Sequence, residues 1–315
     1  MQMRTIGSLE VSIAGLGCNN FGSRIDETAS RAVVDAALDA GVNCFDTADL
    51  YGRGASEEHL GRALRGRRDR AVVATKFGML PPPEGLKGGQ PEWVTRAAEE
   101  SLQRLGMDRI DLYWMHQPDR DTPIGDTLEA LDRLIVAGKV GEIGCSNFSA
   151  AQLDEAAHAA TERGVRPFIT VQNEYSLLHR EPEAEVLPAC HRLGLSFVPY
   201  FPLASGLLTG KYARGTDPPA GTRLAQWPAD RVGRLLNDDR FAVVEQLAAL
   251  AARHGHTLHE LALSWLAANP PVASVIAGAT SPEQVRANAV ATTAWELDDE
   301  VRGEVDRITA RAAAA

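Results

Sequence analysis

The sequence contains few cysteines and no long hydrophobic run. Its four cysteines, Cys18, Cys44, Cys145 and Cys190, are scattered and form no CxxC pair, which argues against a disulfide-rich secreted scaffold and against a zinc knuckle. No apolar stretch approaches the length of a membrane span, and the N-terminal residues MQMRTIGSLE lack the apolar core of a signal peptide. We therefore expect a cytoplasmic protein whose cysteines are reduced thiols.

The chain has no excess of positive charge. Its 32 Lys and Arg residues are outnumbered by 42 Asp and Glu residues, and the formal net charge is −10. This sign argues against nucleic acid or an anionic membrane as the main partner. An anionic small molecule remains compatible with it, because a phosphate site needs only a few local donors. The sequence carries no signal of its oligomeric state.

Metal-binding and dinucleotide-binding patterns are also missing. The segment HGHTLHE at residues 254–260 gathers three histidines and a glutamate, but not in the HExxH order. We expect no metal, although a metal-dependent barrel hydrolase is kept as an alternative. GLGCNNFG begins like a dinucleotide fingerprint, but Asn20 stands where the third glycine belongs. A Rossmann dehydrogenase is therefore disfavoured.

Short β-branched runs alternate with longer segments of helical apolar spacing. Eight strands are expected near residues 13–16, 42–45, 71–75, 112–115, 140–144, 168–171, 196–199 and 274–277, and helices at 28–40, 56–64, 91–105, 123–137, 150–163, 183–193 and 241–254. Residues 1–12 indicate a hairpin that turns at Gly7–Ser8. The repeat of roughly 30 residues is typical of the βα unit, and eight units predict a (β/α)8 TIM barrel. No linker divides the 315 residues, so we expect one domain over 1–315.

Residues 201–240 interrupt this regular repeat after the seventh strand. The segment is rich in glycine, proline and arginine, and a connection of this length is usually functional or disordered. Loops that follow barrel strands lie on the catalytic face. We expect this long loop to cover the site as a flap.

Polar and ionisable residues follow the expected strands at their carboxyl ends. Asp46 follows the second strand, with Tyr51 in the next loop, and Lys76 and His116 end the third and fourth strands. Singly, Asp46 could close a turn, Lys76 could extend to solvent and His116 could be a core imidazole. Together, one ring of a barrel would bring all four side chains to a single site.

These four residue types suit the reduction of a carbonyl group. A free phenol has a pKa of about 10, which is too high for an efficient acid near neutral pH. An ammonium group about 4 Å away contributes roughly 4 kcal/mol at an effective dielectric near 20, so Lys76 is expected to lower the pKa of Tyr51 by up to ~3 units. Asp46 would keep Lys76 charged and in place. His116, as a neutral imidazole, could hydrogen-bond the carbonyl oxygen.

The sequence resembles the aldo-keto reductases over essentially its whole length. The matching segments are GVNCFDTADLYG, AVVATKFG, IDLYWMHQPD, GKVGEIGCSNF, VQNEYSLL, PLASGLLTGKY and VIAGATSPEQVRANAV. It is most similar to the bacterial branch that also resembles the potassium-channel β subunits. The resemblance implies a catalytic tetrad of Asp46, Tyr51, Lys76 and His116 and a nicotinamide cofactor that lies across the barrel mouth.

The resemblance also assigns residues to the cofactor. Ser146, Asn147 and Gln172 would hold the carboxamide, and Tyr200 would stack on the nicotinamide ring. Phe201, Pro202, Leu203, Gly206 and Lys211 would surround the pyrophosphate. The turn at Gly278, Ala279 and Thr280, with Gln284 and Asn288, would meet the adenosine end, and Gly17, Cys18 and Asn19 would border the cofactor.

The resemblance leaves the choice of cofactor open. The loop AGATSPEQ has no basic residue before Arg286, although NADP-selective members often carry one there to pair the 2′-phosphate. We expect NADPH, with NADH as the alternative. Arg223 and Arg286 are candidate phosphate contacts, or else solvated surface residues.

We expect the protein to be an oxidoreductase that acts on an aldehyde or a ketone. Its pocket walls are expected to come from Asn20, Phe21, Tyr51, Phe77, His116, Gln117, Phe148 and Trp227. A cofactor-binding regulatory or sensor subunit with little turnover is the alternative. Asp49 is expected only to shape the loop between Asp46 and Tyr51.

Overall fold

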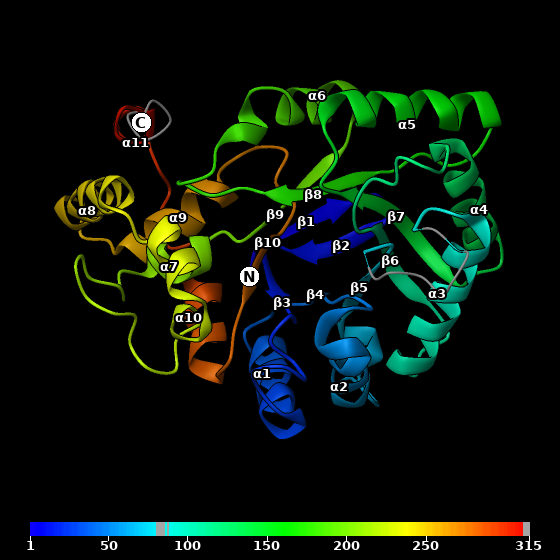
Figure 1. The fold of residues 1–315 in the computed structure, drawn as a ribbon, viewed down its shortest axis with the longest axis horizontal. Coiled ribbons are helices and arrows are strands. Elements are labelled where there is room, and N and C mark those ends of the chain that lie inside the picture. Colours follow the sequence, from blue (N-terminus) through cyan, green and yellow to red (C-terminus); the bar gives the residue numbers. More distant parts are fainter. Residues whose placement is uncertain (80–85, 87, 311–315) are drawn as a thin grey trace.

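The computed structural model describes residues 1–79, 86 and 88–310, and its core is a ring of eight parallel strands (Figure 1). In spatial order they are β10 (Val275–Gly278), β3 (Ala14–Gly17), β4 (Cys44–Asp46), β5 (Val72–Phe77), β6 (Ile110–Met115), β7 (Val140–Ser146), β8 (Thr170–Glu174) and β9 (Ser196–Tyr200). Phe197 joins β9 to the segment before β10, because its N–H donates to Pro271 O at 2.7 Å and its C=O accepts from Ala273 N at 2.9 Å. The predicted (β/α)8 barrel is confirmed.

Helices surround the ring of strands on its outer side (Figure 1). They are α1 (Glu27–Asp39), α2 (Ala55–Ala63), α3 (Pro91–Leu105), α4 (Ile124–Val136), α5 (Ala150–Arg163), α6 (Val186–Leu193), α7 (Ala229–Leu235), α8 (Asp238–Arg253), α9 (Leu258–Ala267), α10 (Pro282–Ala291) and α11 (Asp299–Ala310). Short 3₁₀ segments are η1 (Tyr51–Gly54), η2 (Arg68–Arg70), η3 (Glu181–Glu183), η4 (Ala204–Thr209) and η5 (Leu224–Gln226), and left-handed residues interrupt η1 and η4. Helix ends follow local chemistry: Ser149 and Thr257 begin α5 and α9 with capping boxes, and Gly106 ends α3 in the left-handed region.

The N-terminal hairpin covers one end of the barrel. It consists of β1 (Met3–Ile6) and β2 (Leu9–Ser12), and Ile6 pairs with Leu9, which leaves Gly7–Ser8 as the turn. Gly7 has φ +56°, a value that glycine adopts without strain. Ile6 and Val11 are buried in a cluster with barrel residues that include Trp114. The predicted hairpin is confirmed, and its apolar side chains fill the barrel interior.

Four of the described helices lie outside the helix ranges expected from the sequence. They are α7, within the segment 201–240, and α9, α10 and α11. Leu258 and residues 261–267 of α9 are all buried, so this helix is apolar on nearly every side and has no amphipathic period. Strand β8 also runs three residues beyond the expected hydrophobic segment, because Gln172, Asn173 and Glu174 continue its pairing with β9.

Candidate active site

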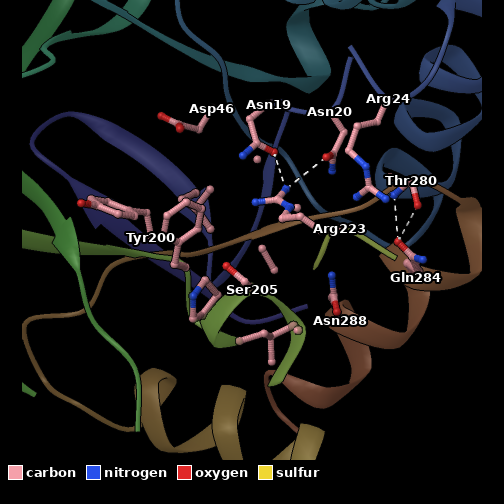
Figure 2. Close-up of a pocket in the computed structure, with 18 of the residues that line it drawn as sticks. Asn19, Asn20, Arg24, Asp46, Tyr200, Ser205, Arg223, Thr280, Gln284 and Asn288 are labelled. Atoms are coloured by element: carbon pink, nitrogen blue, oxygen red, sulfur yellow. Dashed lines mark hydrogen bonds between the residues drawn. The ribbon is translucent and has the colours of Figure 1, made fainter. Parts of the chain in front are cut away.

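A cavity of about 750 Å³ opens at the carboxyl ends of the strands. The loops after β3, β4, β7, β8, β9 and β10 all contribute to its wall, and so does α10. Of the sequence-predicted residues, those at the wall are Gly17, Asn19, Asn20, Asp46, Tyr51, His116, Ser146, Asn147, Gln172, Tyr200, Phe201, Pro202, Leu203, Gly206, Lys211, Arg223, Gly278, Thr280, Gln284 and Asn288. Figure 2 shows this wall, with Asp46 and Tyr200 on one side and Arg24, Thr280 and Gln284 on the other.

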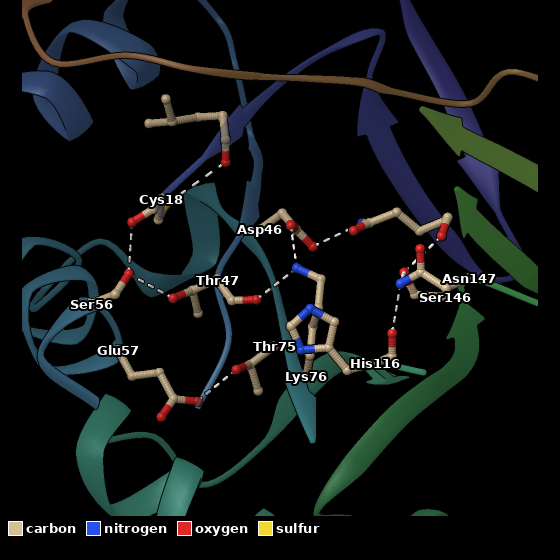
Figure 3. A network of polar contacts seen from close by, with 12 residues as sticks. Cys18, Asp46, Thr47, Ser56, Glu57, Thr75, Lys76, His116, Ser146 and Asn147 are labelled. Carbon is tan, nitrogen blue, oxygen red and sulfur yellow. Dashed lines mark hydrogen bonds and ion pairs between the residues drawn. The ribbon is translucent and has the colours of Figure 1, made fainter. Parts of the chain in front are cut away.

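Asp46 and Lys76 form a buried ion pair at one end of the cavity. The parallel register sets Asp46 opposite Ala74, two residues before Lys76 on β5. Lys76 Nζ pairs with Asp46 Oδ2 and also donates to Thr47 O at 2.8 Å (Figure 3). Burial by itself lowers the pKa of Lys76, but the charges of Asp46 and Tyr51 outweigh it and raise that pKa above 10.5. Lys76 therefore stays charged behind the cavity wall.

Tyr51 stands at the cavity wall, and Lys76 Nζ lies 5.2 Å from the centre of its ring. The sequence analysis expected the charge of Lys76 to give this phenol a lowered pKa. Lys76 does act in that direction, but the pKa is not lowered overall. Desolvation by burial raises the pKa of Tyr51 above 10.0, and the opposing effect of Lys76 does not overcome it. The physical reason is that Asp46 offsets part of the lysine charge while the surrounding protein disfavours a phenolate. Tyr51 is accordingly a protonated phenol at neutral pH.

His116 faces Tyr51 across the same end of the cavity. Their ring centres are 6.0 Å apart, with the planes nearly perpendicular. Burial, together with the charge of Lys76, lowers the pKa of His116 to about 3. Its Nδ1 atom is buried without a hydrogen-bond partner among the described residues. The imidazole is therefore neutral, as expected from the sequence, and has unused hydrogen-bonding capacity.

A chain of amides and hydroxyls extends from this end along the wall. Gln172 Nε2 donates to Asp46 Oδ1 at 3.1 Å, and Ser146 Oγ donates to Gln172 O at 2.7 Å (Figure 3). Asn147 Nδ2 donates to His116 O at 2.9 Å, while its Oδ1 accepts from Tyr200 OH at 2.7 Å. Ser146, Asn147 and Gln172, which the resemblance assigns to the carboxamide, thus lie beside Asp46 and His116.

Three cationic side chains gather further along the cavity. Arg223 donates to the side-chain oxygens of Asn20 at 3.1 Å and Asn19 at 3.3 Å, and Arg24 donates to Gly221 O at 2.9 Å (Figure 2). Burial and then the charge of Arg24 lower the pKa values of both Arg223 and Lys211. Arg24 Nε is buried without a partner among the described residues. This part of the cavity wall carries positive charge and therefore favours the binding of an anion.

Arg24 was missed by the sequence analysis. It stands in the loop between β3 and α1, where the segment GSRID gives no motif that marks it as functional. Its approach to Arg223, 199 positions later, depends on the course of the 201–240 segment. A basic residue within ten positions of a barrel strand end was the one signal that could have suggested it. Arg286, a candidate phosphate contact in the sequence analysis, instead lies 4.0 Å from Glu283 and is absent from the described cavity wall.

Known proteins are similar in sequence to this chain over almost its full length. The family model described as the Aldo/keto reductase family matches residues 14–310. The chain belongs to this family. It is 38% identical over 305 residues to the "Uncharacterized oxidoreductase YrpG" of Bacillus subtilis (strain 168), with 93% of this chain and 90% of that protein covered. It is also 36% identical over 298 residues to a "Probable voltage-gated potassium channel subunit beta" of Oryza sativa subsp. japonica, with 91% and 90% covered.

A protein of the same name from Arabidopsis thaliana is 36% identical over 295 residues, with 91% of this chain and 90% of that protein covered. Membership makes this aldo/keto reductase an oxidoreductase of a family that generally uses NAD(P)H and acts on small carbonyl compounds. In the part of the chain that the structure describes, no helix is long and apolar enough to cross a membrane.

Several backbone conformations of this aldo/keto reductase concentrate at the cavity. Asn147, Phe201 and Ser205 all have positive φ, at 64°, 51° and 58°, and all three border it. Non-glycine residues adopt such conformations only where surrounding contacts hold them, which occurs mainly at functional sites. Gly206 has φ +97°, a backbone conformation that residues with a Cβ atom rarely adopt, so glycine is favoured there.

Some residues that the sequence analysis placed at the site are not at the described cavity wall. Phe21, Phe77 and Phe148 are buried in the hydrophobic core, because a phenyl ring gains more from packing between strand and helix than from lining a polar cavity. Trp227 packs at the edge of the same core and stacks with Arg231, and Gln117 is exposed. Cys18 and Ala279 are buried behind the wall. Met79, Ser205 and His259 border the cavity and were not predicted.

Proposed function

We propose that this protein reduces an aldehyde or ketone to an alcohol with a nicotinamide cofactor, and that Tyr51 donates the proton. The observation that carries the proposal is the grouping of a protonated phenol, a buried ion pair and a neutral imidazole at one end of one cavity. Each of the three supports one need of carbonyl reduction: a proton source, a fixed positive charge and a neutral hydrogen-bond donor.

The cavity residues fit a nicotinamide dinucleotide. The unpartnered Arg24 Nε and the crowded cations around it suit phosphate groups, and the amides of Asn147 and Gln172 suit the carboxamide. Tyr200 lies in the amide-bearing region, where its hydroxyl donates to Asn147 Oδ1, and its ring would stack on the nicotinamide. When bound, the cofactor supplies the hydride.

The protein's own contribution is to orient the carbonyl and to manage charge on its oxygen. Tyr51 and His116 converge on the place where this oxygen would lie, and both are neutral donors at pH 7. Negative charge that develops on the oxygen is stabilised by these hydrogen bonds and by the Lys76 charge behind Tyr51. Tyr51 then transfers its phenolic proton, and Lys76, fixed by Asp46, stabilises the phenolate that is left.

NADPH is the proposed cofactor, with NADH as the alternative. A 2′-phosphate adds two negative charges that need cationic partners, and bidentate guanidinium groups bind phosphate well. Arg24 and Arg223 provide such groups at the cavity wall, and neither forms an ion pair with a described carboxylate. Arg24 thus takes the place of Arg286 beside Arg223 as a candidate phosphate contact.

The proposal is tested with a panel of small aldehydes and ketones, assayed with NADPH and NADH. Replacing Tyr51 by Phe removes the proton donor and should lower kcat by about 10²–10⁴-fold, the usual contribution of a general acid. The Kd for NADPH, followed by fluorescence quenching, should stay within about two-fold. Tyr175→Phe is the matched control, because this phenol bonds Glu183 outside the cavity wall. Near-normal turnover of Tyr51→Phe would overturn the assignment.

A cofactor-binding regulatory subunit is the second candidate, favoured by the similarity to two proteins named as probable channel β subunits. Both candidates predict binding of a nicotinamide cofactor. Only the reductase predicts steady turnover on the carbonyl panel. Tight NADPH binding without turnover on any substrate would favour the regulatory subunit.

A further inference from the structure

Asp49 is a buried carboxyl group that the proposed reaction does not use. It lies between Asp46 and Tyr51 and is only 4% exposed. Neither Oδ1 nor Oδ2 makes a hydrogen bond of good geometry to a described residue, although the nearby Leu50 backbone N–H lowers the pKa of Asp49 in part. Buried carboxyl groups are almost always paired or hydrogen-bonded, because an isolated buried charge is costly. An unpartnered carboxyl group, two residues before the phenol of Tyr51, calls for an explanation.

The surroundings of Asp49 hold more acids than bases. Glu57, at the start of α2, is fully buried and is already paired with Arg104 of α3 and hydrogen-bonded by Thr75 of β5. Glu100 of α3 adds another carboxyl group to this region. The cations that face Asp49 are Arg104 and Lys76, and each is already engaged by a different carboxylate. No cation is left to neutralise an ionised Asp49.

Tyr113 of β6 completes the cluster around Asp49. Its phenol is fully buried and has no hydrogen-bond partner among the described atoms. Asp49 is the charged group that most raises the pKa of Tyr113, after burial itself. The polar groups beneath the Tyr51 loop, Asp49 and Tyr113, are therefore both left without partners in this packing.

The loop that carries Tyr51 is packed tightly on both sides. Asp49 N donates to Lys76 O at 3.2 Å, which ties the loop to the catalytic lysine through the backbone. A Cβ atom on Gly52 would lie 2.9 Å from Phe21 O, and one on Gly54 would lie 2.7 Å from Arg104 Cδ. The loop is thus in close contact with Phe21 at Gly52 and with Arg104 of α3 at Gly54, so a shift of Asp49 is passed along the loop to Tyr51.

We propose that Asp49 is a positioning residue for Tyr51: its neutral carboxyl group lets residues 47–54 pack against α3, and its ionisation displaces Tyr51 from Lys76 and His116. This inference rests on the proposed reductase function. The loop movement follows from the packing just described, since a new buried charge with no partner can be relieved only by bringing Asp49 toward water.

We expect Asp49 to ionise near neutral pH. Burial, and then the charge of Glu57, raise the pKa of Asp49 from 3.8 to about 7. Because the folded value lies above the unfolded one, the folded state holds a proton that the unfolded chain has lost. The contribution of Asp49 to the free energy of unfolding therefore decreases as pH rises from about 3.8 to about 7. Above about pH 7 this contribution no longer changes with pH. Turnover is expected to decline as pH rises through about 7.

The experiment measures kcat and the Kd for NADPH from pH 5.5 to 9 for the wild type, Asp49→Asn and Asp126→Asn. Asp126 is the matched control, a half-exposed aspartate on α4 that pairs with Arg163. In the wild type and the control, kcat should fall by up to about ten-fold per pH unit above about 7, as a single ionisation allows. Asp49→Asn should show a flat profile and should exceed the wild type at pH 8.5. The Kd for NADPH should depend on pH in the same way in the wild type and in both variants.

A wild-type measurement that needs no turnover separates the inference from the reductase assignment. Proteins labelled with ¹³C at aspartate Cγ and tyrosine Cζ are titrated by NMR, and the Asp49 and Tyr51 signals are assigned with Asp49→Asn and Tyr51→Phe. Titration of Asp49 near pH 7 with a parallel shift of the Tyr51 signal supports the inference, even in a protein without turnover. Titration of Asp49 near pH 4, or a Tyr51 signal that does not shift when Asp49 titrates, overturns the inference even in an active reductase. Identical kcat profiles for Asp49→Asn and the wild type also overturn it.

Discussion

The two ends of the cavity handle charge in opposite ways. At the end that holds the proposed catalytic residues, here called the catalytic end, Lys76 is fully buried and is neutralised by Asp46 within the protein. At the other end, Arg24, Arg223 and Lys211 lie close together, and the structure shows no ion pair between them and any described carboxylate. Their printed hydrogen-bond partners are neutral oxygens of Asn19, Asn20 and Gly221.

This difference indicates what each end is built for. A charge that is already neutralised attracts little from outside, but it holds the groups around it in fixed positions. A crowded set of cations with neutral partners is less stable alone, as the lowered pKa of Arg223 shows, and gains when an anion binds. The catalytic end therefore provides geometry, and the cationic end provides affinity.

The largest expected effect comes from breaking the paired end. Lys76→Met leaves Asp46 as an unpaired buried charge and should lower the free energy of unfolding by about 3–5 kcal/mol. It should also lower kcat by about 10²–10⁴-fold, because Tyr51 loses the charge that stabilises its phenolate. Urea unfolding and steady-state kinetics measure the two effects. Lys211→Met is the matched control, and a similar stability loss in that variant would contradict the comparison.

A smaller effect is expected at the cationic end. Arg24→Gln removes one charge from the phosphate region and should weaken NADPH binding by about 10–100-fold, from the ~1.5–3 kcal/mol of a hydrogen bond to a charged group. NADH binding should change by less than about three-fold, because it lacks the 2′-phosphate. Isothermal titration at two salt concentrations measures both. Arg286→Gln is the control with no expected change, and equal losses for both cofactors would remove Arg24 from NADPH selection.

The smallest effect concerns pH at the catalytic end. Because the pKa of His116 falls from 6.5 to about 3 in the folded protein, this imidazole resists protonation there. Neutral His116 contributes fully to the free energy of unfolding above about pH 6.5, and this contribution is lost as pH falls toward about 3. The melting temperature of the wild type should therefore fall more steeply over this range than that of His116→Gln. An NMR titration that finds His116 protonated at pH 6 would remove its role as a neutral donor.

Much of the fold was predictable because it depends on local patterns. The βα repeat, the hairpin at Gly7–Ser8 and the strand-end positions of Asp46 and His116 follow from spacing along the chain. In a closed parallel barrel all carboxyl strand ends face one side, so residues at those ends are brought together whatever their sequence separation. The bounds of α9 were not predicted, because its burial on nearly every side removes the amphipathic signal.

The substrate side of the site was less predictable. Phe21, Phe77 and Phe148 follow strands just as the catalytic residues do, yet they turn into the core between strand and helix. Spacing along the chain does not show whether a side chain at a strand end points into the cavity or into the core, because the backbone there no longer has the regular pleat of a strand. Arg24 joins the cavity only because the 220–223 segment crosses near the loop after β3, as its hydrogen bond to Gly221 shows.

The sequence by itself determined which chemical groups stand at the strand ends and in what order, since both depend on periodicity and residue type. Only the tertiary structure decided their protonation: Tyr51 was expected to have a lowered pKa and has a raised one, and Asp49 was expected to be a loop residue and is a buried, unpartnered acid. The reason is that a pKa reflects burial and the sum of nearby charges, and those charges come from β5, β6, α2 and α3, which only the closed barrel brings around one loop.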